Sequence, residues 1–204
     1  MEKLRLGVLA SGRGTNLQAI IDAARSGRIR AEVAVVVADR IGARARERAR
    51  RAGIPEYFVD LAAYPTKEAF EHGIVSILER HGVELVCLAG YMRILTRVML
   101  EHYRNRIINI HPSLLPAFPG LHAQRQALEY GVRFAGCTVH FVEEEVDAGP
   151  IILQAVVPVL PDDTVEALSA RILEQEHRIY VEAIQLYQAG RLKIEGRRVR
   201  IRPE

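Results

Sequence analysis

Short apolar runs alternate with helical segments through the first half of the chain, and this alternation restricts the fold more than any other feature. Residues 3–10, 31–39 and 84–90 are rich in Val, Leu and Ile, as strands buried on both faces are. Segments with apolar residues at helical spacing separate them. Because a strand, a helix and a parallel strand form a right-handed crossover, the pattern predicts a mostly parallel, Rossmann-like sheet with helices on both faces.

The second half of the chain has a different pattern. Two strand-like runs follow one another with only a turn between them, which predicts an antiparallel addition to the sheet. A long helix and a closing hairpin come last. The predicted strands are residues 3–10, 31–39, 56–59, 84–90, 106–110, 134–142 and 150–159, with a hairpin at 192–202, and the predicted helices are residues 15–27, 43–53, 67–82, 96–103, 123–131 and 163–190.

Length and composition exclude several classes of protein. The 204 residues suit one α/β domain, 1–204, with an alternating half at 1–105 and a second half at 106–204. With 49% apolar residues, disorder is excluded. No apolar run is long enough to cross a bilayer or act as a leader, so we expect a cytoplasmic protein without a membrane partner.

Neither charge nor cysteine content points to nucleic acid or metal. The net charge is +3, and the run "RARERARR" is typical of a solvated helix with Ala on its inner face, so we expect no nucleic-acid partner. Cys87 and Cys137 lie in apolar runs and are expected to be buried free thiols. There is no metal-ligand spacing, so we expect no metal. The expected partners are small-molecule substrates, and a monomer and a homodimer both remain open.

The loop "SGRGTN", residues 11–16, lies between a predicted strand and a predicted helix. Its free amides and the positive end of the helix dipole favour an anion. Asp39 follows the next strand and could serve as the ribose-binding acid of a dinucleotide fold, but Leu17 occupies the place where that motif needs a small residue. A cradle for a monophosphate, made by Gly12, Gly14, Thr15 and Asn16, therefore fits better. The alternative is a plain tight turn with Thr15 as the helix N-cap.

Asn109 and His111 lie two residues apart at the end of a predicted strand, so both point to the same face. An amide and a protonated imidazole aimed at one point stabilise an oxyanion, by about 3–4 kcal/mol per donor. Asp147, in the turn "VDAGP", is the best carboxylate to keep the imidazole charged. Taken singly, each residue also fits a structural role: a strand cap, a buried histidine and an Asp-Ala-Gly turn. His140, inside a predicted strand, is expected to be structural or to support this site.

Five motifs carry a resemblance to a known family. In chain order they are "SGRGTNLQAII", "LAGYMRIL", "NIHPSLLPAFPGLHAQRQALEYG", "TVHFVEEEVDAGPIILQ" and "EQEHRIY". Together they resemble the folate-dependent phosphoribosylglycinamide formyltransferase family of purine biosynthesis, and they cover nearly the whole chain. The two longest motifs are specific to folate-dependent formyltransferases and hydrolases, and the first points to the ribonucleotide enzymes.

The resemblance implies a phosphate-binding half at 1–105 and a catalytic, folate-binding half at 106–204. It also implies which residues bind each substrate. The group that would hold the ribonucleotide comprises Gly14, Thr15, Asn16 and Glu176. The group that would line the folate site comprises Lys67, Met92, Arg93, Ile94, Leu95 and Asn109.

The resemblance also implies the reaction, with 10-formyltetrahydrofolate as co-substrate and no metal. The amino group of 5'-phosphoribosylglycinamide would attack the formyl carbon, Asn109 and protonated His111 would hold the oxyanion, and Asp147 would support the His charge and help to move a proton, through water. This trio would be catalytic.

Three rival functions remain open on the sequence. A 10-formyltetrahydrofolate deformylase uses the same trio on water but carries an N-terminal regulatory domain, whereas this sequence starts at its first strand. Methionyl-tRNA formyltransferase has an added C-terminal domain and matches the pattern only in part. A nucleotide-binding regulatory module would keep the glycine loop and would need neither Asn109 nor His111.

Overall fold

The computed structural model describes residues 2–203. The chain divides into two compact units, the first ending at Asn109 and the second beginning at Ile110, and each is described by itself. That the whole chain acts as the single domain expected from the sequence stays a prediction.

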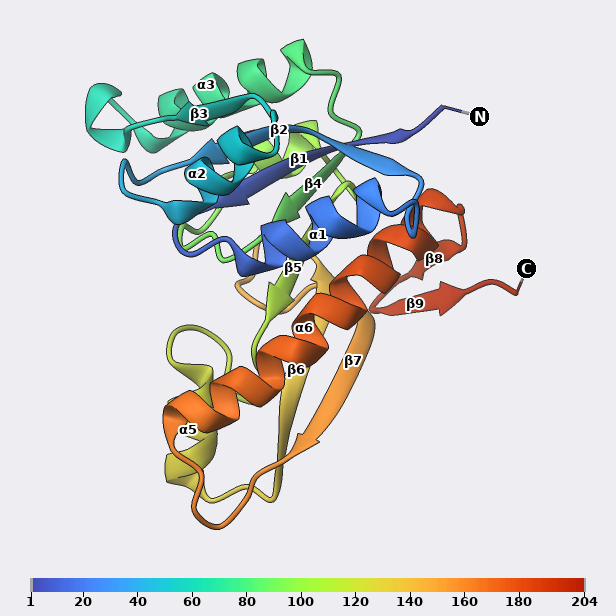
Figure 1. Ribbon diagram of the computed structural model, residues 1–204. Coiled ribbons are helices and arrows are strands. Elements are labelled where there is room, and N and C mark those ends of the chain that lie inside the picture. The colour runs from blue at the N-terminus through green and yellow to red at the C-terminus, as the bar shows by residue number, and fades with distance from the viewer. Residues whose placement is uncertain (1, 204) are drawn as a thin grey trace. The chain divides into compact units, whose positions relative to one another are not determined.

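The first unit contains a parallel sheet with the strand order β3-β2-β1-β4-β5 (Figure 1). Every pairing between these neighbours is parallel. The alternation predicted from the sequence is therefore confirmed. In chain order the elements are β1 (Leu4–Ala10), α1 (Thr15–Arg25), β2 (Ala31–Ala38), α2 (Arg44–Arg51), β3 (Glu56–Phe58), the short 3-10 helix η1 (Leu61–Ala63), α3 (Lys67–Arg80), β4 (Leu85–Leu88), α4 (Arg97–His102) and β5 (Ile107–His111).

The strand order reverses between β1 and β4. The chain runs outward from β1 to β3 and then resumes at β4 on the other side of β1. Because the crossovers are right-handed, this reversal places α1 and α2 on one face and α3 and α4 on the other. Accordingly, α1 and α2 contact each other and β2, and α3 contacts α4 (Figure 1). The carboxyl ends of β1 and β4 thus meet at the switch point, where open α/β sheets bind their ligands.

Close packing of α3 on β1 explains a glycine inside a strand. Leu6, Val8 and Leu9 of β1 are completely buried. A Cβ at Gly7 would lie 2.6 Å from the side chain of Leu78, so only glycine lets α3 approach this closely. The close approach lets the apolar side of α3 cover the sheet.

The second unit is built on antiparallel strands and one long helix. β6 pairs antiparallel with β7, and β8 pairs antiparallel with β9, as predicted from the sequence. One parallel pair, Ile151 with Arg198, joins β9 to β7. In chain order the elements are α5 (Ala123–Tyr130), β6 (Phe134–Phe141), β7 (Ile151–Pro158), α6 (Val165–Gln188), β8 (Leu192–Glu195) and β9 (Arg198–Ile201).

The helix α6 covers the strands β6 and β7 of this unit (Figure 1). It begins where the hydroxyl of Thr164 accepts a hydrogen bond from the Ala167 amide at 3.1 Å, an N-cap. Its inner stripe, which includes Leu168, Ile172 and Ile179, is buried. No helix in the described part of the chain is long and apolar enough to cross a membrane.

Both cysteines are buried free thiols, as predicted. Burial raises the pKa of the Cys137 thiol to about 12, so this thiol is neutral and packs as a small apolar group.

Candidate active site

The strand β5 carries Asn109 and His111 at its end. Side chains alternate along a strand, so these two residues share one side and Ile110 faces the other. His111 is 5% exposed, and Asn109 is half-buried. A buried imidazole next to an amide on the same side of a strand end is the arrangement that the sequence predicts.

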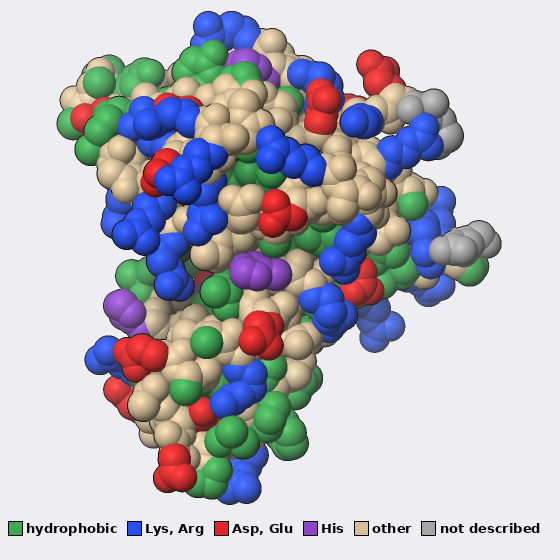
Figure 2. All heavy atoms as spheres, in the orientation of Figure 1, with side chains coloured by type: hydrophobic (Ala, Val, Ile, Leu, Met, Phe, Trp, Pro, Cys, Tyr) green, Lys and Arg blue, Asp and Glu red, His purple; other side chains and the backbone are tan. Residues whose placement is uncertain are grey.

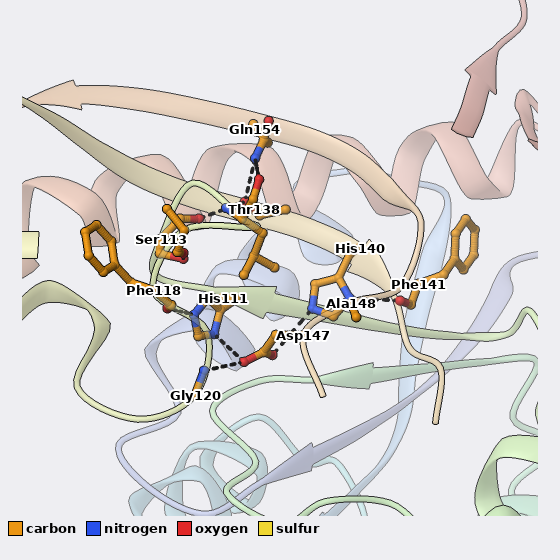
Figure 3. A network of polar contacts seen from close by, with 12 residues as sticks. His111, Ser113, Phe118, Gly120, Thr138, His140, Phe141, Asp147, Ala148 and Gln154 are labelled. Atoms are coloured by element: carbon orange, nitrogen blue, oxygen red, sulfur yellow. Dashed lines mark hydrogen bonds and ion pairs between the residues drawn. The ribbon is translucent and has the colours of Figure 1, made fainter. Parts of the chain in front are cut away.

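Both ring nitrogens of His111 face hydrogen-bond acceptors (Figure 3). Nε2 lies 2.9 Å from the carbonyl oxygen of Phe118, and Nδ1 lies 3.4 Å from Oδ2 of Asp147. A carbonyl oxygen cannot donate, so Nε2 carries the hydrogen in this contact. A hydrogen on Nδ1 would face the Asp147 carboxylate.

Asp147 lies between two histidines and a loop amide (Figure 3). Its Oδ2 accepts a hydrogen bond from the Gly120 amide at 2.8 Å, and its Oδ1 lies 3.8 Å from Nε2 of His140. The backbone of Asp147 has φ 54°, in the left-handed region that Asp tolerates better than most residues. The structure thus brings His111 and Asp147 together, although 36 positions separate them in the sequence (147 − 111).

The turn that carries Asp147 is held on two sides. The guanidinium of Arg197, in the β8–β9 turn, donates to the carbonyl oxygen of Ala148 at 2.8 Å. Gly149 packs so closely on β6 that a Cβ there would overlap the carbonyl oxygen of Phe141. These contacts fix the direction in which the carboxylate points.

His140 is a buried neighbour of the carboxylate. It is 2% exposed, and its Nδ1 donates to the carbonyl oxygen of Phe141 at 2.8 Å. Burial lowers the pKa of His140 below its ordinary value, and this effect outweighs the opposing influence of the Phe141 carbonyl and of Asp147. A neutral His140 therefore supports the site by packing beside Asp147 while its hydrogen bond to Phe141 holds the ring in place.

A polar network fixes the segment after β5 (Figure 3), and no sequence pattern indicated it. The Thr138 hydroxyl donates to the carbonyl oxygen of Ser113 at 2.7 Å and accepts from the Leu115 amide at 3.1 Å. The Gln154 amide donates to the carbonyl oxygen of Leu115 at 2.9 Å and to the Thr138 hydroxyl at 3.0 Å. Thr138 and Gln154 come from β6 and β7, so only the paired strands reveal their role.

In the first unit, the glycine loop leads from β1 into α1. Gly14 is the N-cap residue with φ 71°, and no side chain caps the helix. The alternative in which Thr15 is the N-cap is therefore wrong, because Thr15 is already the first residue of α1. The backbone of the loop thus leads directly into a helix N-terminus, whose first-turn amides and dipole attract anions.

The segment after β4 lies at the same switch point of the first unit. Ser11, which opens the glycine loop, accepts a hydrogen bond from the Met92 amide at 2.9 Å. Arg93 forms an ion pair with Asp39, Nε to Oδ2, at 2.6 Å, so this carboxylate is engaged by the segment and not presented as a ribose ligand. Met92 and Ile94 are 53% and 58% exposed, whereas Leu95 is buried.

The structure places the remaining candidates on helices of different units. Lys67 is the first residue of α3, after the N-cap Thr66. Glu176 is in α6 and is 7% exposed. Within residues 2–203, no group of three or more His, Cys, Asp or Glu side chains is arranged to hold a metal ion.

The fold and site define an α/β protein with a glycine loop at its switch point and a pair formed by a buried imidazole and a half-buried carboxylate. Residues 4–184 match the formyl transferase family, and the chain belongs to this family. It is 44% identical over 191 residues to phosphoribosylglycinamide formyltransferase of Escherichia coli K12, covering 94% of this chain and 90% of that protein.

Other relatives show how widely this type of chain occurs. A trifunctional purine biosynthetic protein of Gallus gallus is 46% identical over 94% of this chain, but the match spans only 19% of that longer protein. Glycinamide ribonucleotide transformylase 1 from Symbiobacterium toebii has a similar structure, with a TM-score of 0.97, 63% identity, and coverage of 98% of this chain and 95% of that chain. A formyltetrahydrofolate deformylase from Pseudomonas syringae gives a TM-score of 0.92 at 28% identity, over 99% of this chain and 67% of that chain.

Proposed function

We propose that this chain transfers the formyl group of 10-formyltetrahydrofolate to the amino group of 5'-phosphoribosylglycinamide, in de novo purine biosynthesis. The observation that carries the reaction type is the pair His111–Asp147, in a member of the formyl transferase family. The choice of acceptor is supported by relatives such as the E. coli enzyme, whose length this chain covers almost entirely.

In the proposed reaction, the substrate amine forms a bond to the formyl carbon, and the carbonyl oxygen of the formyl group becomes an oxyanion. Asn109 and His111 donate hydrogen bonds to this oxyanion, and Asp147 stabilises the charge on the imidazole. The carbon–nitrogen bond to the folate then breaks, and a proton passes from the attacking amine to the leaving nitrogen, through water beside Asp147. The products are the formylated glycinamide and tetrahydrofolate.

The hydrogen bond between His111 and Phe118 restricts how His111 can bind the oxyanion. Nε2 of His111 already donates to the carbonyl oxygen of Phe118. If the same N–H is to hold the oxyanion, the oxyanion must replace the Phe118 carbonyl or share the hydrogen with it. Asn109, on the same side of β5, supplies the second donor.

The binding roles follow the same proposal. Gly14, Thr15 and Asn16 hold the phosphate of the ribonucleotide, and Glu176 contacts its sugar. Met92, Arg93, Ile94 and Leu95 line the site for the folate ring system, with Lys67 as a further folate contact. The exposed side chains of Met92 and Ile94 support this assignment, since exposed apolar groups next to a switch point are available to an aromatic ring.

We also propose that the chain works without a metal, in the cytoplasm, on small molecules and without nucleic acid, as a monomer or a homodimer. The reaction needs only hydrogen-bond donors and a proton path, which side chains supply.

The experiment that tests the proposal mixes purified protein with 10-formyltetrahydrofolate and follows deformylated folate by absorbance, with and without the ribonucleotide. Product that depends on the ribonucleotide supports the transferase. If no product forms under either condition, the proposed enzyme activity is contradicted, and the chain would be a binding module.

Deformylation is the second candidate function, because the deformylase from Pseudomonas syringae has a similar structure. A hydrolase would release the same folate product equally fast without the ribonucleotide. The glycine loop would then need a different ligand.

A further inference from the structure

The helix α2 contains five arginines, and one of them is turned toward the glycine loop of the same unit. Figure 2 shows blue side chains covering the surface where α2 lies. Arg46 and Arg50 pair with Glu56, Nε to carboxylate, at 2.6 and 2.9 Å, and Arg51 pairs with Glu47. By contrast, Arg48 and Ala45 of this helix contact the glycine loop.

Arg48 contacts both the glycine loop and the helix that follows it. Its Nε donates to the carbonyl oxygen of Arg13 at 2.9 Å, and its Nη1 donates to Oε1 of Gln18, on α1, at 3.2 Å. Next to it, the Ala45 amide donates to the carbonyl oxygen of Gly12 at 3.1 Å. Two successive loop carbonyls are thus tied to α2.

Close packing strengthens this attachment. A Cβ at Gly14 would lie 2.7 Å from the Cα of Ala45, so the loop lies directly against the first turn of α2. Gly14 also has φ 71°, which a side chain would oppose. The helix α2 therefore packs behind residues 12–14 of the loop.

The tied carbonyls determine where the loop amides point. In a trans peptide the C=O and the N–H point in opposite directions. When the Gly12 and Arg13 carbonyls face α2, the amides of Arg13 and Gly14 face away from it. Successive amides that point to one side form a nest for an anion, and the first turn of α1 follows directly.

We propose that Arg48 is a positioning residue for the phosphate of the ribonucleotide substrate, which rests on the phosphate-binding role of the loop in the proposed function. Its guanidinium does not contact the anion. It holds the Arg13–Gly14 peptide in the orientation that aims the Gly14 amide at the phosphate. Arginine suits this task because its planar fork binds the Arg13 carbonyl and the Gln18 amide oxygen together, whereas a lysine ammonium is a point donor.

The test compares Arg48→Met and Arg48→Lys with Arg51→Met, a matched control that removes an arginine from the same helix without touching the loop. Loss of a hydrogen bond that orients the loop should raise the KM for the ribonucleotide by about five- to tenfold in Arg48→Met. The KM for 10-formyltetrahydrofolate and kcat should stay within about twofold of wild type, the scale of a neutral surface change. Arg48→Lys should restore part of the loss, and Arg51→Met should match wild type.

An unchanged KM for the ribonucleotide in Arg48→Met would overturn the inference, and so would an equal rise in both KM values, which would indicate general damage. If Arg48→Met does not fold, Arg48→Lys and Gln18→Ala replace it, and each should raise only the KM for the ribonucleotide.

Calorimetric titration with ribose 5-phosphate separates this inference from the proposed function. Wild type should bind it more tightly than Arg48→Met, even if no formyl transfer is found. Equal affinity in the two proteins, or binding by neither, would overturn the role of Arg48.

Discussion

Nε2 of His111 donates a hydrogen bond to the carbonyl oxygen of Phe118 across 2.9 Å. The acceptor belongs to a residue with φ 52°, a left-handed conformation that is uncommon for a bulky side chain. Since Nδ1 of the same ring faces Asp147, the imidazole is oriented from both ends. A ring held in this way keeps its place on β5 while a substrate enters, as pre-organised electrostatic catalysis requires.

Replacing Asp147 with Asn tests the charge of this pair. Asn tolerates the left-handed backbone, and its amide oxygen can still accept from Gly120, so the geometry should survive. The His111 ring then lacks the carboxylate that would stabilise its positive charge in the proposed reaction, and we expect kcat to fall by about 10²- to 10³-fold. Steady-state kinetics with both substrates measure this effect. A kcat within threefold of wild type, in a variant with a normal unfolding midpoint, would contradict the role of Asp147.

Replacing Asn109 with Ala separates an enzyme from a binding module. We expect turnover to fall by about 10²-fold or more, because one of two oxyanion donors is lost. Binding of the ribonucleotide, measured by calorimetry, should stay near wild type, because the phosphate role is assigned to the loop after β1. Loss of binding together with turnover would show that Asn109 maintains the fold instead of stabilising an oxyanion.

The pH dependence of stability follows from His140. Burial lowers its pKa in the folded state, so above about pH 6.5 the ring is neutral in both states and contributes nothing to the pH dependence. As the pH falls below that value, the unfolded chain takes up a proton that the folded protein does not, and the free energy of unfolding decreases. One such group costs no more than about 1.4 kcal/mol per pH unit.

Replacing His140 with Asn isolates this effect. The Asn side chain can still donate to the Phe141 carbonyl but does not titrate. Urea unfolding at pH 7.5 and 5.5 should show a smaller loss of stability on acidification for the variant than for wild type. Equal losses would mean that His140 binds protons alike in the folded and unfolded states.

The elements could be predicted from the sequence because their signals are local. Continuous apolar runs gave β1, β2 and β4, and the i, i+2 spacing placed Asn109 and His111 on one side of a strand. The partners of these groups were not predictable. The Phe118 carbonyl reaches His111 only through the path of a loop with an unusual backbone, and Thr138 reaches Ser113 only after β6 is in place.

Asp39 is a second residue whose partner could not be predicted from the sequence. Its position after β2 suggested a ribose ligand, which is a correct use of the local pattern. Arg93, distant in the sequence, engages it in an ion pair at 2.6 Å. The Asp39 side chain is 2% exposed, so this pairing is fixed by the packing of the switch point, which no local pattern encodes.

Gly149 supports the carboxylate of Asp147 by allowing a close approach, and its replacement is the most direct test of that turn. In Gly149→Ala the new Cβ would overlap the Phe141 carbonyl, so β6 and the turn must move apart. Overpacking of this kind costs about 1–3 kcal/mol of stability and shifts Asp147 away from His111. We therefore expect a lowered unfolding midpoint and a kcat reduced by at least about tenfold, since small displacements of catalytic groups are costly. Gly42→Ala, where the new Cβ meets open space and the backbone φ is not positive, serves as the control for an added methyl group. If Gly149→Ala retained wild-type stability and kcat, the turn would not depend on its contact with Phe141.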